Sequence, residues 1–288
     1  MKTINRSFLT LILHLLIHTQ AYSGPAIIFD LNGVLFTTNT RAALWHLGPA
    51  KIAHYQLVYG KNPLRLKAKL YEILNALIAN NDTTTILDDA AIPMPKLMQQ
   101  WLIGTTDGQS IIEDINRYIE QQDTLHPNSL GNDLVRNLAQ IIFDPATFVA
   151  TRSVIWDGIY FALECKQAGY QIYILSNWDA DSFTLLYAQY KDIFDHFDGI
   201  MISGTQQTMK PLPTIFHKLL HLYDLTPADC IFIDDQQENI DTAASLGIKT
   251  VLCPTTGYPL KQPNFNAVKQ AYKNSILTQT ARGHESIS

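Results

Sequence analysis

The sequence is short of cysteine, and the cysteines present are not spaced for a metal site. Cys165, Cys230 and Cys253 are the three cysteines in 288 residues, and no CxxC spacing occurs. This argues against a zinc site and against a disulfide framework. Because Cys230 and Cys253 border apolar runs, we expect buried free thiols. A single Cys230–Cys253 disulfide is the alternative if the protein is exported.

The sequence also lacks an excess of basic residues. Its formal net charge is −5, and 16% of the residues are charged. No nucleic-acid partner is therefore expected, because binding to the phosphate backbone requires a basic face. The hydrophobic fraction of 47% is typical of a globular protein with a buried core. An acidic protein of this kind binds a phosphate ester only if a lysine or a metal ion supplies positive charge locally.

The N-terminal apolar run is too short for a membrane span, which takes roughly 20 residues. Lys2 and Arg6 precede this run, Phe8–Ile17, and small residues follow at the spacing of a cleavage site. The pattern predicts a secretory signal peptide over residues 1–23. We therefore expect a secreted or periplasmic protein with no stable membrane span after signal removal. The alternative is a cytoplasmic protein with an uncleaved leader or a misassigned start codon.

Short apolar runs rich in Ile and Val, without polar alternation, indicate parallel strands covered on both faces. They are Ala26–Phe29, Ile172–Leu175, Gly199–Ile202, Ile231–Ile233 and Lys249–Cys253. Segments with helical spacing separate them, including Trp156–Ala168, a helix capped by Asp181, a helix beginning near Pro213, and Asn239–Leu246. This alternation predicts an α/β fold with a Rossmann-like, doubly wound parallel sheet.

The region from Thr38 to Thr151 lacks strand-like runs and is largely helical by pattern. We interpret it as an all-helical cap domain inserted into the α/β core. The predicted division is a core of residues 24–37 and 150–265, a cap of residues 38–149 and a polar tail of residues 266–288. The tail has few large apolar side chains after Tyr272, which indicates a frayed helix or disorder.

Polar residues follow successive predicted strands. They are Asp30 and Asn32 after the first, Ser176 and Asn177 after the second, Lys210 beyond the third, and Asp234, Asp235 and Asn239 at and after the fourth. In a parallel sheet the carboxyl ends of the strands share one edge, where ligands bind. We therefore expect these side chains to converge there.

This group of residues suits phosphate chemistry. Ionised Asp30 and Asp235 would repel each other when close together, and a hard divalent cation removes that conflict. A site whose ligands are a few carboxylates, retained waters and a substrate phosphate suits Mg²⁺. Lys210 and the Ser176 hydroxyl can hold a phosphoryl group while a carboxylate attacks phosphorus as a covalent nucleophile.

The segments FDLNGVL, ILSNW, the lysine of MKP and IFIDDQQENI resemble, in order, the four motifs of the haloacid dehalogenase superfamily. Their form is most similar to the subfamily with a helical cap after the first motif, which includes glucose-1-phosphatase-like phosphatases and 2-haloacid dehalogenases. The resemblance implies a Mg²⁺-dependent hydrolase acting on a small phosphorylated metabolite.

The resemblance also implies a role for each matching residue. Asp30 is the nucleophile and a magnesium ligand, and Asn32 contributes its backbone carbonyl as a second ligand. Asp235 is the main acidic ligand, with Asp234 close by. Ser176 and Asn177 bind the phosphoryl group, Lys210 stabilises its charge and orients Asp30, and Asn239 steadies the metal loop without touching the metal.

One residue departs from the pattern of phosphatases in this superfamily. They carry a second aspartate, the general acid and base, where this chain has Asn32. An amide cannot transfer that proton, and the loss typically lowers the rate by about 10²–10⁴-fold. Three hypotheses follow: a slow phosphatase, a non-catalytic protein that binds Mg²⁺ and a phosphate ligand, or a dehalogenase-type hydrolase. Trp178, beside Ser176 and Asn177, either lines the pocket or packs under the cap. The sequence determines neither the substrate nor the oligomeric state.

Overall fold

The computed structural model describes residues 25–59, 65–78, 85–88, 92–123, 129–253, 255–256 and 262–272. The predicted signal peptide, residues 1–23, lies outside the described residues. Within these ranges, no helix combines the length and the apolar character that crossing a membrane requires.

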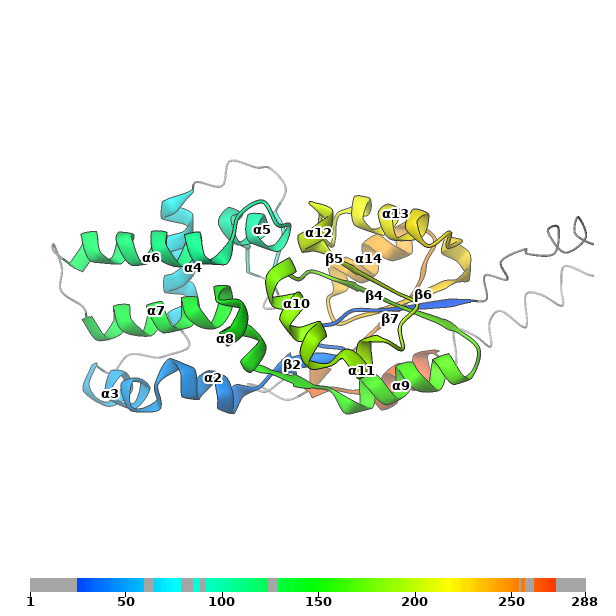
Figure 1. Ribbon diagram of the computed structural model, residues 1–288, viewed down its shortest axis with the longest axis horizontal. Coiled ribbons are helices and arrows are strands. Elements are labelled where there is room, and N and C mark those ends of the chain that lie inside the picture. Colours follow the sequence, from blue (N-terminus) through cyan, green and yellow to red (C-terminus); the bar gives the residue numbers. More distant parts are fainter. Residues whose placement is uncertain are drawn as a thin grey trace, which may run out of the picture.

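The core is a five-stranded parallel sheet with the strand order β5-β4-β1-β6-β7 (Figure 1). The strands are β1 (Ala26–Phe29), β4 (Gln171–Ser176), β5 (Gly199–Ile202), β6 (Cys230–Asp234) and β7 (Lys249–Leu252). Each coincides with a predicted strand to within one or two residues. The predicted α/β fold with a doubly wound parallel sheet is confirmed.

Helices cover both faces of this sheet. In β1, Ile27 and Phe29 pack on one face, while Ala26 and Ile28 pack on the other. The first face is covered by α9 (Trp156–Gln167), α10 (Ala180–Gln189) and α11 (Lys191–Phe194). The second is covered by α13 (Pro213–Leu222) and α14 (Gln237–Ser245). Burial on both faces explains why the strand sequences are continuously apolar.

A second group of helices packs around its own hydrophobic cluster. The helices around this cluster are α3 (Pro49–Tyr59), α4 (Leu66–Leu77), α5 (Lys96–Leu102), α6 (Gly108–Asp123), α7 (Ser129–Phe143) and α8 (Pro145–Ala150). α2 (Thr40–Leu47) joins them from outside the cluster, where its Leu47 carbonyl accepts a hydrogen bond from Asn137 Nδ2 of α7 at 2.9 Å. We call these seven helices the helical lobe. Figure 1 shows the lobe beyond the end of the sheet toward which β1 runs. This arrangement places the lobe next to the carboxyl ends of the strands.

Several short elements escaped the sequence analysis. Strands β2 (Phe36–Thr38) and β3 (Arg152–Val154) pair antiparallel where the chain enters and leaves the lobe. They are too short to show a hydrophobic period. The others are α12 (Ser203–Gln206), the 3-10 helix η2 (Pro227–Asp229), β8 (Thr255–Thr256) and β9 (Gln262–Pro263).

The structure corrects one local prediction. Asp179, and not Asp181, caps α10, because the helix begins two residues earlier and the Asp179 side chain accepts a hydrogen bond from Ser182 N at 2.9 Å. Residues 265–272 form a helix, in line with the frayed-helix alternative for the start of the predicted tail, and residues 273–288 lie outside the described residues. Val268 of this helix is fully buried in the cluster around α9.

All three cysteines are free and buried, as predicted. Burial raises the pKa of each thiol to about 12. The thiols are therefore protonated at neutral pH and act as apolar packing groups.

Candidate active site

The ends of three adjacent strands bring the predicted residues together. Phe29 of β1 is level with Ile174 of β4 and with Ile233 of β6. Asp30 follows directly, and its backbone N–H donates to the Ile233 carbonyl at 2.9 Å. Asp234 ends β6 one residue later. Parallel register therefore places the carboxylates of Asp30 and Asp234 side by side.

Lys210 lies between these two carboxylates. Its Nζ is 2.7 Å from Asp30 Oδ1 and 2.6 Å from Asp234 Oδ2, and its side chain is 1% exposed. The ammonium also lies 5.4 Å from the centre of the Phe232 ring. Burial by itself lowers the pKa of Lys210, but Asp234 and Asp30 together hold that pKa above its ordinary value. Lys210 therefore stays charged.

The surroundings of Asp30 shift the pKa of its carboxyl group in opposite directions. Burial raises the pKa of its carboxyl group most strongly, the nearby Lys210 lowers it, and Asp234 raises it again. The resulting pKa of Asp30 is about 6. The carboxylate is thus ionised at neutral pH but poorly solvated, and this is the state in which it gains most from a cation or from reaction with an electrophile.

Asp234 is fully hydrogen bonded. Its Oδ1 accepts from Gln236 N at 2.8 Å, and its two oxygens lie 3.0 and 3.1 Å from Asn239 Nδ2. Together with the Lys210 ion pair, these contacts hold Asp234 in a buried network. Asn239 therefore holds the Asp234 side chain in place.

Asp235 occupies the more open side of the group, next to the turn after β1. A Cβ atom added to Gly33 would lie 2.3 Å from Asp235 Oδ2, and the φ of Gly33 is +85°. Gly33 was not among the predicted site residues, although a glycine directly after Asn32 is a signal of such a close approach. Half-buried Asn32 lies in the same turn, which is closed by bonds from Leu35 N and Phe36 N to the Leu31 carbonyl.

The carboxylates of Asp30, Asp234 and Asp235 form one group, in which each offers an oxygen within 4.8 Å of the others. The Lys210 ammonium forms ion pairs with Asp30 and Asp234, so the group of three carboxylates keeps an excess of negative charge. A hard divalent cation fits the remaining negative charge, because Mg²⁺ prefers carboxylate oxygen. The donor set therefore matches the predicted metal.

Ser176 and Asn177 end β4 beside this group. The Asn177 side chain forms hydrogen bonds with both backbone groups of Lys210. Its Nδ2 donates to the Lys210 carbonyl at 2.9 Å, and its Oδ1 accepts from Lys210 N at 2.8 Å. Ser176 Oγ is buried and has no hydrogen-bond partner among the described residues. A buried hydroxyl without a partner is costly. A phosphoryl oxygen would satisfy it.

Trp178 is 2% exposed and packs between the core and the lobe. Its ring lies edge-on to Phe148 of α8, with centroids 5.1 Å apart, and its Nε1 donates to Ser182 Oγ at 2.9 Å. Of the two roles considered for Trp178, packing under the helical lobe is therefore the one observed.

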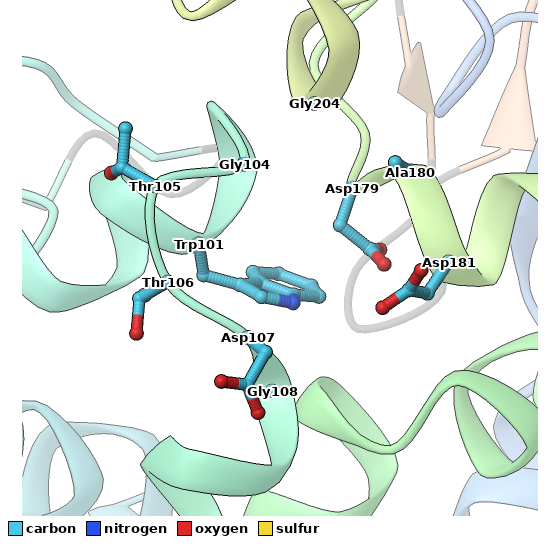
Figure 2. Close-up of a pocket in the computed structure, with 10 residues that line it drawn as sticks. All are labelled: Trp101, Gly104, Thr105, Thr106, Asp107, Gly108, Asp179, Ala180, Asp181 and Gly204. Atoms are coloured by element: carbon cyan, nitrogen blue, oxygen red, sulfur yellow. The ribbon is translucent and has the colours of Figure 1, made fainter.

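A cavity of about 330 Å³ lies nearby, between the lobe and the start of α10 (Figure 2). It is lined by Trp101 and residues 104–108 of the lobe, and by residues 179–181 and Gly204 of the core. None of the predicted site residues lines it. It marks the seam between the two parts of the molecule.

Comparison with known proteins yields a family match and several partial relatives. The family described as haloacid dehalogenase-like hydrolase matches residues 25–247. A sesquiterpene phosphatase of Aspergillus oryzae is 32% identical over 85 residues, which is 30% of this chain and 43% of that protein. Mouse N-acylneuraminate-9-phosphatase is 34% identical over 58 residues, which is 20% of this chain and 23% of that protein.

Mouse bifunctional epoxide hydrolase 2 is 28% identical over 117 residues, 40% of this chain, and the match spans only 21% of the hydrolase. Among solved structures, a haloacid dehalogenase family enzyme of Bacteroides thetaiotaomicron, in complex with magnesium and inorganic phosphate, superimposes with a TM-score of 0.50 and 15% identity. The superposition covers 81% of this chain and 96% of that one. At this identity the likeness concerns the fold alone.

Proposed function

Since the chain belongs to the haloacid dehalogenase-like hydrolase family, as its motifs predicted, we propose that it is a Mg²⁺-dependent phosphohydrolase acting on small phosphate monoesters. The observation that carries this proposal is the group of three carboxylates, two of which form ion pairs with the buried Lys210. The phosphatases among its partial relatives and the magnesium and phosphate bound by its structural neighbour support it.

We assign the metal contacts to Asp30, Asp235 and the backbone carbonyl of Asn32. The sequence placed Asp234 among the ligands too, but both of its oxygens already accept hydrogen bonds inside the fold. We propose that Asp234 mainly holds Lys210 and Asn239. Bound Mg²⁺ would neutralise charge and orient the phosphate.

The covalent step belongs to Asp30. A carboxylate oxygen of Asp30 attacks phosphorus, an aspartyl-phosphate forms, and the bond from phosphorus to the ester oxygen breaks. Water then attacks phosphorus, the bond to Asp30 breaks, and inorganic phosphate leaves. Lys210 and the Ser176 hydroxyl stabilise the charge on the phosphoryl oxygens, while Asn177 holds the backbone of Lys210 in place.

The departing ester oxygen needs a proton or must be a weak base. Asn32 cannot donate one as a carboxylic acid does. The proposed enzyme should therefore favour substrates with acidic leaving groups, such as aryl phosphates, over sugar phosphates. A non-catalytic protein that binds Mg²⁺ and phosphate is the second candidate, and Asn32 is the observation that favours it. The acidic group argues against a dehalogenase, because carbon–halogen displacement needs no metal.

The first test is phosphate release by residues 24–288 from an aryl phosphate and from a panel of sugar phosphates. Each reaction is run with Mg²⁺ and with chelator, and Asp30→Asn is the matched control. Turnover that requires Mg²⁺ and disappears in Asp30→Asn is the expected result. A folded protein that binds Mg²⁺ without turnover would favour the non-catalytic candidate.

The second test varies the leaving group. In the wild type, kcat should fall steeply as the leaving group becomes more basic, because no protein acid assists it. In Asn32→Asp the dependence should flatten, and turnover of the poorest leaving groups should rise by about 10²–10⁴-fold. Equally shallow slopes in both proteins would show that another group supplies the proton.

We also propose that the protein is exported, on the basis of the pattern of residues 1–23. The test is the N-terminal sequence of the protein recovered from its native cell. A chain that begins after residue 23 supports export, and a retained leader supports a cytoplasmic location.

A further inference from the structure

The helical lobe contacts both chain segments that carry the phosphate-binding residues. One segment is Asn177-Trp178 at the end of β4, and the other is Met209-Lys210 before α13. The Asn177 side chain joins the two by its paired hydrogen bonds to Lys210. Any contact of the lobe with these segments therefore bears on the position of the lysine.

Met209 makes the first contact. It is 1% exposed and belongs to the hydrophobic cluster of the lobe. Among the described residues, Met209 is the one buried member of that cluster that the α/β core contributes. It directly precedes Lys210, whose backbone is held on its other side by Asn177. The lobe and β4 together thus fix the backbone from which the Lys210 ammonium reaches Asp30.

Ser203 makes the second contact. Its Oγ accepts a hydrogen bond from Trp178 N at 2.9 Å and donates to the Leu102 carbonyl, at the end of α5, at 2.6 Å. One buried hydroxyl therefore bridges the strand end and the lobe. The packing of the Trp178 ring against Phe148 of α8 adds a third link at the same point.

The two parts meet backbone to backbone beside this bridge, at the seam in Figure 2. A Cβ atom on Gly104 of the lobe would lie 2.2 Å from the carbonyl oxygen of Gly204. Gly204 N in turn donates to the Trp178 carbonyl at 2.9 Å. A displacement of the lobe is thereby transmitted to Gly204 and Trp178.

We propose that the docked helical lobe sets the positions of Asn177 and Lys210, and that Met209 and Ser203 are positioning residues for phosphoryl transfer. The inference rests on the proposed function, because it concerns the same site. A misplacement of 1 Å can lower a rate by about 10²-fold when catalysis depends on positioning. Loosening these contacts should therefore affect turnover more than folding.

The experiment compares Met209→Ala with Met94→Ala. Both methionines are buried in the same cluster, but Met94 adjoins no predicted site residue. The melting temperatures of the two variants should fall by similar amounts, since each substitution truncates a methionine in the same hydrophobic cluster. At a temperature well below both transitions, Met209→Ala should lower kcat for an aryl phosphate about 10²-fold. Met94→Ala should leave kcat close to that of the wild type.

Two further variants guard against a misfolded Met209→Ala. Met209→Leu conserves volume and should restore kcat to within a few-fold of the wild type. Ser203→Ala removes one hydroxyl and little volume. It should lower kcat by up to about tenfold, the equivalent of one hydrogen bond.

Calorimetric binding of inorganic phosphate in the presence of Mg²⁺ gives a readout that needs no turnover. Met209→Ala should weaken phosphate binding at least about tenfold, as expected for a disturbed contact with a charged group, and Met94→Ala should not. If Met209→Ala and Met94→Ala have the same kcat and the same phosphate affinity, the inference is overturned. Turnover by the wild type would still leave the proposed function intact. If the wild type binds phosphate without turnover, the proposed function fails and the binding comparison alone decides the inference. A wild type that does neither overturns both.

Discussion

Replacing Lys210 by methionine tests the charge balance at the centre of the site. Lys210→Met removes the ammonium and keeps most of the side-chain volume, leaving Asp30 and Asp234 buried without their partner. Breaking a buried ion pair in this way costs about 3–5 kcal/mol. For a chain of this size that corresponds to a fall in melting temperature of roughly 6–20 °C.

The pH dependence of that loss identifies its cause. Lys210 holds the pKa of Asp30 down against the effect of burial, so the pKa of Asp30 should rise further in Lys210→Met. Protonation of Asp30 then relieves the repulsion at low pH. The difference in melting temperature between Lys210→Met and the wild type should therefore be largest at pH 8 and should narrow toward pH 5.

The assay is thermal unfolding in chelator, followed by circular dichroism at several pH values. Lys218→Met is the matched control, because Lys218 is exposed and makes a single hydrogen bond within the described part of the chain, to the Gln206 carbonyl. Such surface changes stay within about 0.5 kcal/mol. If Lys210→Met melts as Lys218→Met does at pH 8, the ion pairs contribute no such stability and the reasoning is refuted.

Three further predictions concern the same molecule. Asp30→Asn should stabilise the metal-free protein above pH 6. Burial raises the pKa of Asp30 in the folded protein from 3.8 to about 6, so the wild type loses about 3 kcal/mol of stability as the pH rises from 4 through 6, and the variant does not. An equal difference in melting temperature between variant and wild type at pH 4 and at pH 8 would contradict this. Gly33→Ala should cost about 1–3 kcal/mol through its positive φ and weaken Mg²⁺ binding, because the new Cβ displaces Asp235; unchanged Mg²⁺ titrations would argue against Asp235 as a ligand. The three thiols should not react with a thiol reagent at pH 8 until the protein unfolds, since their pKa values are about 12, and a fast phase in the native protein would disagree.

Local patterns in the sequence determined the strands and the order of the chemical groups. A strand buried on both faces must be apolar throughout, so the runs around Ile27, Ile174 and Phe232 were readable without a structure. Polar residues directly after such runs must lie at the carboxyl edge of a parallel sheet. The grouping of Asp30 and Asp234 followed from that rule. Lys210 was expected there from its place in the loop beyond the third strand, and the structure brings the three together.

Contacts between distant segments were decided only by the tertiary structure. Asp234 is bound by Lys210 and Asn239, whereas Asp235 lies against the turn at Gly33. This difference depends on how the segments after β1 and β6 meet. The burial of Val268 depends on neighbours far along the chain, whereas the cap of α10 is a local contact between Asp179 and Ser182. Periodicity reports which face of an element is apolar and not which element will cover it. For that reason the sequence named the groups that carry the chemistry, whereas the contacts of Met209 and Ser203 with the helical lobe appear only in the folded molecule.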